Sequence, residues 1–198
     1  KRELAVLAAG TLGLLAIRHG DAVSVLHGDA DAVRRVPPGR SEGALEHALR
    51  TIDGAIAGAS APSDREALLT AVARTVSRRA IVVVVTDEAP MTETTDRLLR
   101  RLTVQHDVLW VTVRAAEPVP ASGGTPARRD VATGWAVPAY LHGDRDIVDE
   151  VERVRSTHDL ARIEMLDRLE ISHADLASQA EAPKDMLRML HRRANVGA

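Results

Sequence analysis

The segment from Ala80 to Val85 (AIVVVV) constrains the fold of this 198-residue chain more than any other part of it. Five successive β-branched residues favour a strand, and the absence of polar alternation indicates a strand that is buried on both faces. Such strands are typical of the centre of a parallel sheet, in which helices connect successive strands. The segment therefore predicts an α/β fold, with Thr86-Asp87-Glu88 at the carboxyl end of a central strand.

The flanking segments continue the alternation of helices and strands that is typical of α/β folds. Apolar periodicity predicts helices over residues 2–18, 42–57, 65–78 and 144–169, a helix that follows Thr92 and runs to about residue 105, and a last short helix over 184–193. Ser41 and Thr92 are the expected N-caps of the helices that follow them. Residues 107–113 predict a second apolar strand. A loop is expected over 115–129 and a further short strand over 130–139, while 171–176 is either a connector or a strand.

A β-hairpin is expected between the first two helices. Residues 21–27 and 32–36 have strand character, and the turn signal Gly28-Asp29 lies between them. The sequence Pro37-Pro38-Gly39 is expected to end the second strand. These elements together predict an open, mostly parallel sheet with helices on both faces and one antiparallel edge hairpin. We assign residues 1–142 to this α/β domain and 143–198 to a C-terminal helical extension packed on it.

Composition excludes several functional classes. The 26 basic and 28 acidic residues give a net charge of −2, so the chain lacks the basic field on which nucleic-acid binding depends. Its three aromatic residues provide no stacking platform for single-stranded bases. The absence of cysteine excludes disulfides, thiolate metal sites and a cysteine nucleophile.

No segment predicts a membrane span or a signal peptide. The longest run without charge, Leu4 to Ile17, has 14 residues, whereas a transmembrane helix needs about 20. We expect the protein in the cytoplasm or on the cytoplasmic face of the membrane. Because the sequence does not start with methionine, we also expect it to begin inside a longer protein.

The sequence contains no phosphate-binding loop, dinucleotide fingerprint, HExxH or GxSxG motif. This lowers the odds of a P-loop ATPase, a Rossmann dehydrogenase, a zinc protease or an α/β-hydrolase. The eight histidines show no metal-ligand spacing, and His106 and His142 are expected on the surface.

Two short segments are candidate sites. Ligands of open α/β sheets bind outside the carboxyl ends of the strands, where Asp87 could offer oxygen ligands to Mg²⁺. Alternatively, Asp87 accepts hydrogen bonds from backbone N–H groups and caps the following loop or helix. Ser63-Asp64 is the second candidate, and its simpler interpretation is an N-cap for the helix that starts at residue 65.

Several motifs, in order, resemble a known family. Residues 20–26 (GDAVSVL) are similar to the G-D-x-V-G-L segment of von Willebrand factor A-like domains. PPGR follows at 37–40, and Ser63-Asp64 lies where such proteins often have Thr-Asp. RR at 78–79 precedes the valine-rich strand that ends in Thr86-Asp87. The remaining motifs are HDV at 106–108 and the segments 166–169 and 189–193. This order resembles the bacterial domain of unknown function 58 family. Its members look like von Willebrand A domains, with a Rossmann-like fold, and are typically encoded beside MoxR-type AAA+ ATPases.

The resemblance implies a metal-ion-dependent adhesion site. In von Willebrand A domains such a site takes ligands from an Asp-x-Ser-x-Ser on the first strand, from a Thr and from an Asp. Ser63 would take the place of the Thr, and Asp87 that of the last Asp. The Asp-x-Ser-x-Ser is missing from the sequence, so the resemblance places it upstream of Lys1, on a strand that precedes the first helix. We therefore expect Mg²⁺ binding to be weak or absent, and a micromolar affinity in isothermal titration would contradict this.

The function implied by the resemblance is that of a non-enzymatic protein-interaction module. It would have no catalytic residues, and it would work with a MoxR-type ATPase in the assembly or maturation of other proteins. The main alternative is a Mg²⁺-dependent phosphatase, nuclease or similar hydrolase that uses Asp87. We disfavour it because no second carboxylate is predicted at a neighbouring strand end, and such chemistry uses clustered acids. A structural domain with a decayed site is the third hypothesis.

Overall fold

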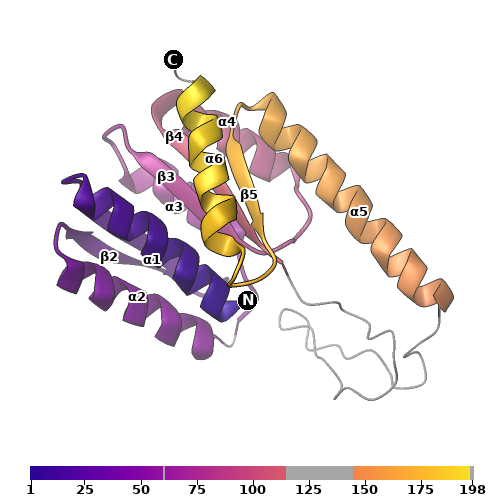
Figure 1. Cartoon of the computed structure of the whole chain (residues 1–198), viewed down its shortest axis with the longest axis horizontal. Coiled ribbons are helices and arrows are strands. Elements are labelled where there is room, and N and C mark those ends of the chain that lie inside the picture. The colour runs from indigo at the N-terminus through magenta and orange to yellow at the C-terminus, as the bar shows by residue number, and fades with distance from the viewer. Residues whose placement is uncertain (60, 115–144, 197–198) are drawn as a thin grey trace.

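The computed structural model describes residues 1–59, 61–114 and 145–196 (Figure 1). These residues form six helices and five strands: α1 (Arg2–Arg18), β1 (Val23–Gly28), β2 (Val33–Gly39), α2 (Glu42–Ala57), α3 (Arg65–Thr75), β3 (Ile81–Thr86), α4 (Glu93–Gln105), β4 (Asp107–Val113), α5 (Arg145–Arg168), β5 (Ser172–Leu176) and α6 (Ala182–Val196). Strands β3, β4 and β5 form a parallel sheet, and β1 and β2 form a separate antiparallel hairpin. The expected α/β class, with a parallel sheet and an antiparallel hairpin, is confirmed.

The central strand of the parallel sheet is β4, with β3 and β5 on either side. The residues of β4 from Val108 to Val113 are all buried, whereas those of β3 are half-buried and Ile81 is 65% exposed. Within the described residues, the AIVVVV segment is a parallel strand at the edge of this sheet rather than the predicted central strand. Helices cover the faces of an edge strand as well as those of a central one, so an apolar run alone does not fix its place in the sheet.

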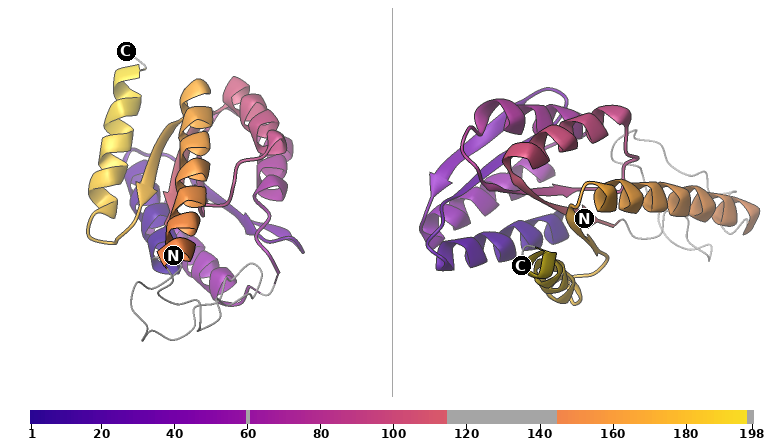
Figure 2. Two further views of the ribbon diagram at one scale, coloured as in Figure 1. Left: turned by 90° about the vertical axis from the view of Figure 1, so that its right-hand side faces the viewer. Right: turned by 90° about the horizontal axis from the view of Figure 1, so that it is seen from above.

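Side chains of β4 alternate between two apolar clusters on the two faces of the sheet. Leu109, Val111 and Val113 lie with residues of α1 and α6. On the opposite face, Val108 and Trp110 lie with residues of α3, α4 and α5. Figure 2 shows α1 and α6 on one side of the sheet and α3 and α4 on the other. The expectation of helices on both faces is met.

In the hairpin, β2 is longer than predicted, whereas β1 starts two residues later than predicted. Its turn is closed by Asp29, whose Oδ1 accepts hydrogen bonds from the N–H groups of Asp31 and Ala32 (3.1 and 3.2 Å). Strand β2 continues through two prolines to Gly39, so the prediction that Pro37-Pro38-Gly39 ends the strand is wrong. In a two-stranded sheet each strand has a free edge, where a proline breaks no ladder hydrogen bond.

Helix α1 links the hairpin to the parallel sheet. It spans the predicted residues and ends before Gly20, whose φ of +85° is a backbone conformation that favours glycine. Within α1, Gly13 allows a close approach of α2, since a Cβ there would lie 2.6 Å from Leu45 Cδ1. Helix α1 packs on β1 as well as on β3, which belong to different sheets.

Most other helix boundaries agree with the prediction. Helix α3 ends earlier, at Thr75, and the side-chain amide of Gln105 donates to the carbonyls of the next two residues, Val76 and Ser77. Helix α6 starts two residues earlier than predicted, with Pro183 in its first turn, where an N–H is not required. Residues 172–176 form a strand rather than a connector.

Some predictions need correction or lie outside the described residues. His106 is 4% exposed rather than on the surface, because it joins α4 directly to the buried strand β4. The predicted loop 115–129, the strand 130–139, His142 and the domain boundary at 142–143 lie outside the described residues. None of the helices that the structure describes is sufficiently long and apolar to cross a membrane.

Candidate functional site

A pocket of about 240 Å³ lies at the carboxyl end of β3. Two loops line it, the one between α2 and α3 and the one between β3 and α4. The lining residues are Ser63, Asp64, Arg65, Glu66, Thr86, Asp87 and Ala89. Both predicted site residues thus line one pocket, which we call the Ser63–Asp87 pocket.

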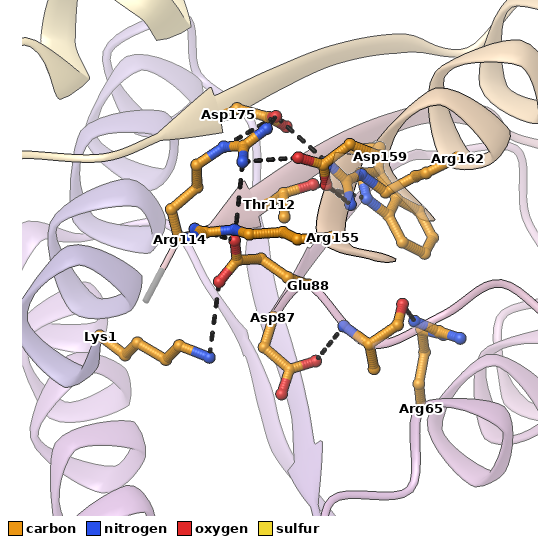
Figure 3. A network of polar contacts seen from close by, with 12 residues as sticks. Lys1, Arg65, Asp87, Glu88, Thr112, Arg114, Arg155, Asp159, Arg162 and Asp175 are labelled. Carbon is orange, nitrogen blue, oxygen red and sulfur yellow. Dashed lines mark hydrogen bonds and ion pairs between the residues drawn. The ribbon is translucent and has the colours of Figure 1, made fainter. Parts of the chain in front are cut away.

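Asp87 is half-buried in the loop after β3. Its Oδ1 accepts a hydrogen bond from the N–H of Ala89 at 3.1 Å (Figure 3). The capping interpretation therefore holds for one carboxylate oxygen. Within the described residues the other oxygen accepts no hydrogen bond. Both interpretations of Asp87 are compatible with this geometry, because a carboxylate offers two oxygens.

Ser63 and Asp64 have different local roles. Asp64 is the N-cap of α3, and its Oδ1 accepts a hydrogen bond from the N–H of Ala67 at 2.8 Å. Ser63 is exposed, and its hydroxyl makes no hydrogen bond within the described residues. The N-cap interpretation thus applies to Asp64 and leaves the Ser63 hydroxyl available to a ligand.

Arg65 connects the two loops of the pocket. Its guanidinium donates to the carbonyl oxygens of Ala89 (3.1 Å) and Pro90 (2.7 Å) and to the Thr95 hydroxyl (3.3 Å). The same group lies 5.8 Å from the centroid of the Trp110 ring, within cation–π range. Burial lowers the pKa of Arg65 from its ordinary value, although the nearby negative charge of Asp87 acts in the opposite direction.

Glu66 uses its carboxylate at the start of α4. It accepts hydrogen bonds from the hydroxyls of Thr92 and Thr95. Thr92 is also the N-cap of α4, as predicted, and accepts from the N–H of Thr95 at 3.0 Å. Of the three carboxylates that line the pocket, Asp64 therefore caps α3 and Glu66 accepts two hydroxyl hydrogen bonds at the start of α4, whereas Asp87 accepts one hydrogen bond within the described residues.

A network of arginines and carboxylates lies next to the pocket. It joins the loop after β3, the carboxyl ends of β4 and β5, and one side of α5 (Figure 3). We call it the arginine–carboxylate network, and its members are Glu88, Arg114, Arg155, Asp159, Arg162 and Asp175. Lys1 approaches it, with Nζ 3.9 Å from Glu88 Oε2.

Arg114 and Arg162 carry most of the network. Arg114 nitrogens lie 2.6 Å from oxygens of both Asp159 and Asp175, and Arg162 contacts the same two carboxylates at 2.7 and 3.1 Å. Burial disfavours the charged form of Asp159, but the two arginines outweigh it, so the pKa of Asp159 is lowered. These contacts favour the ionised, arginine-bound form of Asp159.

The network was not predicted. Asp175 is a carboxylate near the end of β5, which β4 separates from β3, so it does not lie at the end of a strand that neighbours β3. Arginines also bind it, whereas a catalytic metal needs carboxylates with free oxygens. The available signal was the spacing of Arg155, Asp159 and Arg162, which places three charges on one side of a helix.

The donor chemistry of the Ser63–Asp87 pocket suits a hard cation, since a hydroxyl and a carboxylate are oxygen ligands. The number of donors is small. In the parts of the chain that the structure describes, no three acidic or histidine side chains are grouped so that they could hold a metal ion. The residues thus match Mg²⁺ in type but not in number, and weak or absent binding stays a prediction.

Comparison with protein families identifies the chain. A family model described as "Protein of unknown function DUF58" matches residues 1–139. The chain belongs to this family. The resemblance inferred from the sequence motifs is confirmed, and the part that matches DUF58 contains α1 to α4, β1 to β4, Ser63 and Asp87. No curated protein and no solved structure matches the chain.

Proposed function

We propose that this DUF58 chain is a non-enzymatic protein-interaction module whose contact point is the Ser63–Asp87 pocket. One observation carries the proposal: a hydroxyl and a half-free carboxylate from two separate loops line one pocket at the carboxyl end of β3. Open α/β sheets bind ligands at this edge.

The finer fold proposal is a von Willebrand A-like domain. Two features support it, the hairpin and the fact that α1 packs on strands of two different sheets. The hairpin turn lies beside the Ser63 loop, since the N–H of Ala30 donates to the carbonyl of Pro62 at 3.0 Å. In this proposal a further strand lies between β1 and β3 and leads into α1. Its carboxyl end would bring a third loop to the pocket.

The pocket would act as a partial metal-ion-dependent adhesion site. Ser63 and Asp87 would be two of the ligands of Mg²⁺, and the third loop would supply the others. When bound, the ion would offer an open coordination position to an acidic side chain of the partner. The chain's own task is to present the Ser63 hydroxyl and the Asp87 carboxylate at a fixed separation, on loops that α3 and β3 position. The proposed partner is a MoxR-type AAA+ ATPase, and the joint activity is assembly or maturation of other proteins.

The competing function is a Mg²⁺-dependent phosphatase or related hydrolase with Asp87 as the key carboxylate. Asp175 alone among the network residues gives it some support, because it places a second carboxylate at a strand end. A chromogenic phosphate ester assay with and without Mg²⁺ separates the two functions. Metal-dependent turnover that is lost in Asp87→Ala would show that the protein is an enzyme rather than a non-enzymatic interaction module.

The interaction proposal is tested by measuring binding of the protein to a MoxR-type AAA+ ATPase, the proposed partner. We expect Asp87→Ala to weaken binding by at least roughly tenfold, as the loss of a charged contact does. Asp185→Ala is the matched control, because Asp185 lies on α6 and pairs with Arg188 rather than with the pocket. Equal binding by wild type and Asp87→Ala would favour the decayed-site hypothesis.

A further inference from the structure

The two candidate ligands come from loops that are far apart in sequence, so something must hold the loops in register. Arg65 lies two residues after Ser63, at the first position of α3. Its side chain leaves that helix and reaches the backbone two and three residues after Asp87, at the carbonyls of Ala89 and Pro90. A single side chain therefore spans both loops of the pocket.

The guanidinium is suited to this contact. Its planar fork donates in two fixed directions, which matches two consecutive carbonyl groups, whereas a lysine ammonium is a point charge without that geometry. Trp110, which is fully buried, lies against the same group, and the Thr95 hydroxyl accepts from it. The head of Arg65 is thus fixed by contacts with the β3–α4 loop, with β4 and with the first turn of α4.

The backbone turn that orients the Asp87 carboxylate includes Ala89, one of the residues that Arg65 contacts. Ala89 donates its N–H to Asp87 Oδ1 and accepts from Arg65 through its carbonyl. A change in the position of Ala89 therefore moves the hydrogen-bond donor that orients Asp87. The cap of α3, in contrast, is made by Asp64 and Ala67 and involves no atom of the Arg65 side chain.

We propose that Arg65 is a positioning residue of the Ser63–Asp87 pocket, which sets the separation between the Ser63 hydroxyl and the Asp87 carboxylate. The purpose that we assign to Arg65 rests on the proposed function, whereas its contacts with the two loops do not depend on it. Mg²⁺ demands near-ideal octahedral geometry, so a looser Asp87 loop weakens its binding even when both ligands are intact.

The test uses two variants of the 198-residue chain and amide hydrogen exchange followed by NMR. Arg65→Lys keeps the charge, and Arg65→Met keeps much of the apolar contact with Trp110. Neither side chain has the planar donor fork that binds the carbonyls of Ala89 and Pro90. We expect exchange of the Ala89 amide to accelerate by roughly tenfold in both variants, which is the effect of weakening one hydrogen-bonded turn. Exchange of the Ala67 amide, in the α3 cap, should not change.

The matched control is Arg97→Lys, the same substitution at an exposed arginine of α4 that donates to Thr94. It should leave both amides unchanged. Unchanged exchange at Ala89 in the Arg65 variants would overturn the positioning role. An equal acceleration at Ala67 and Ala89 would overturn it too, because Arg65 would then stabilise the region as a whole.

A titration of the complete gene product with Mg²⁺ separates this inference from the proposed function. If wild type binds Mg²⁺ at Ser63 and Asp87, the affinity should fall by roughly tenfold or more in Arg65→Lys, since the metal tolerates little displacement of its ligands. If wild type binds no Mg²⁺ there, the adhesion-site proposal fails. The Ala89 result then decides the role of Arg65 by itself.

Discussion

The two faces of strand β4 are built from different chemistry. The face toward α1 and α6 is apolar from Leu109 to Val113, after Asp107, which pairs with Arg193 of α6 at the start of the strand. The face toward α3, α4 and α5 begins apolar, with Trp110, and ends charged, with Arg114. Helix α6 packs through buried methionines and one ion pair, whereas the middle of α5 is held by several ion pairs. The comparison shows that the arginine–carboxylate network lies on one face at the carboxyl end of the sheet, beside the Ser63–Asp87 pocket.

The largest loss of stability is expected when the arginine–carboxylate network is broken, at the charged end of the face toward α3, α4 and α5. Arg162 is 1% exposed and contacts Asp159 and Asp175. Arg162→Ala leaves both carboxylates without this partner, and removing one member of a buried ion pair costs about 4 kcal/mol. The free energy of unfolding in urea measures the loss. Arg153→Ala, at an exposed α5 arginine that pairs with Glu150, should leave the free energy of unfolding nearly unchanged. Similar losses for the two variants would show that the network does not stabilise the fold.

A slightly smaller effect is expected on the apolar face. Met189 of α6 is fully buried in the cluster with Leu176. Met189→Ala should reduce the free energy of unfolding by about 3 kcal/mol, because it removes apolar contacts and leaves a cavity. The loss should be the same at pH 7 and at pH 4, since no titratable group is involved. Leu187→Ala on the exposed side of the same helix is the control, and a loss as large there would contradict the assignment of faces.

The pH dependence of stability sharpens the contrast between the faces. The pKa of Asp159 is lowered in the folded state below its ordinary value of 3.8. A carboxyl group of this kind stabilises the fold above its unfolded-state pKa, and the contribution is lost as the pH falls through the folded-state pKa. Asp159→Asn should therefore reduce the free energy of unfolding by about 2 kcal/mol at pH 7, which is less than the loss of a fully buried pair. The reduction should be clearly smaller at pH 3. Urea unfolding at both pH values measures this, and an equal cost at both would show that the network contributes no pH dependence.

The smallest effects are expected at the pocket itself. Asp64→Ala removes the N-cap of α3 and should cost about 1 kcal/mol. Asp87→Ala removes one turn hydrogen bond in a half-exposed loop and should cost about 0.5 kcal/mol. Thermal or urea unfolding distinguishes the two. A loss above about 2 kcal/mol for Asp87→Ala would indicate a structural role for Asp87, since half-exposed turn residues rarely cost so much.

Local signals predicted the elements and the pocket residues well. The caps Ser41, Asp64 and Thr92 each accept the expected backbone hydrogen bond, because capping depends on residues only a few positions apart. Ser63 and Asp87 line one pocket because loops at the carboxyl end of a parallel sheet converge there. The sequence carries this information in short segments.

Long-range pairing limited the prediction. The order of the strands depends on which edges meet, so the AIVVVV segment could not be distinguished from a central strand by its composition. The contacts of Arg114 with Asp159 and Asp175 join residues that are far apart in sequence, and an arginine after a strand gives no local sign of such partners. The role of Arg65 could not be predicted either, because its partners are backbone carbonyl groups, which every residue has.

The register of β5 has a consequence for the order of folding. Ser172 pairs beside Leu109, so the ladder between β4 and β5 closes a loop that contains all of α5, whereas the β1–β2 hairpin closes a short turn at Asp29. Non-local parallel pairing is slow, because the entropy of loop closure opposes it before the contacts form. We therefore expect the hairpin to form early and β5 to dock late. A nascent chain would then have the two loops of the Ser63–Asp87 pocket well before Asp175 completes the arginine–carboxylate network beside them.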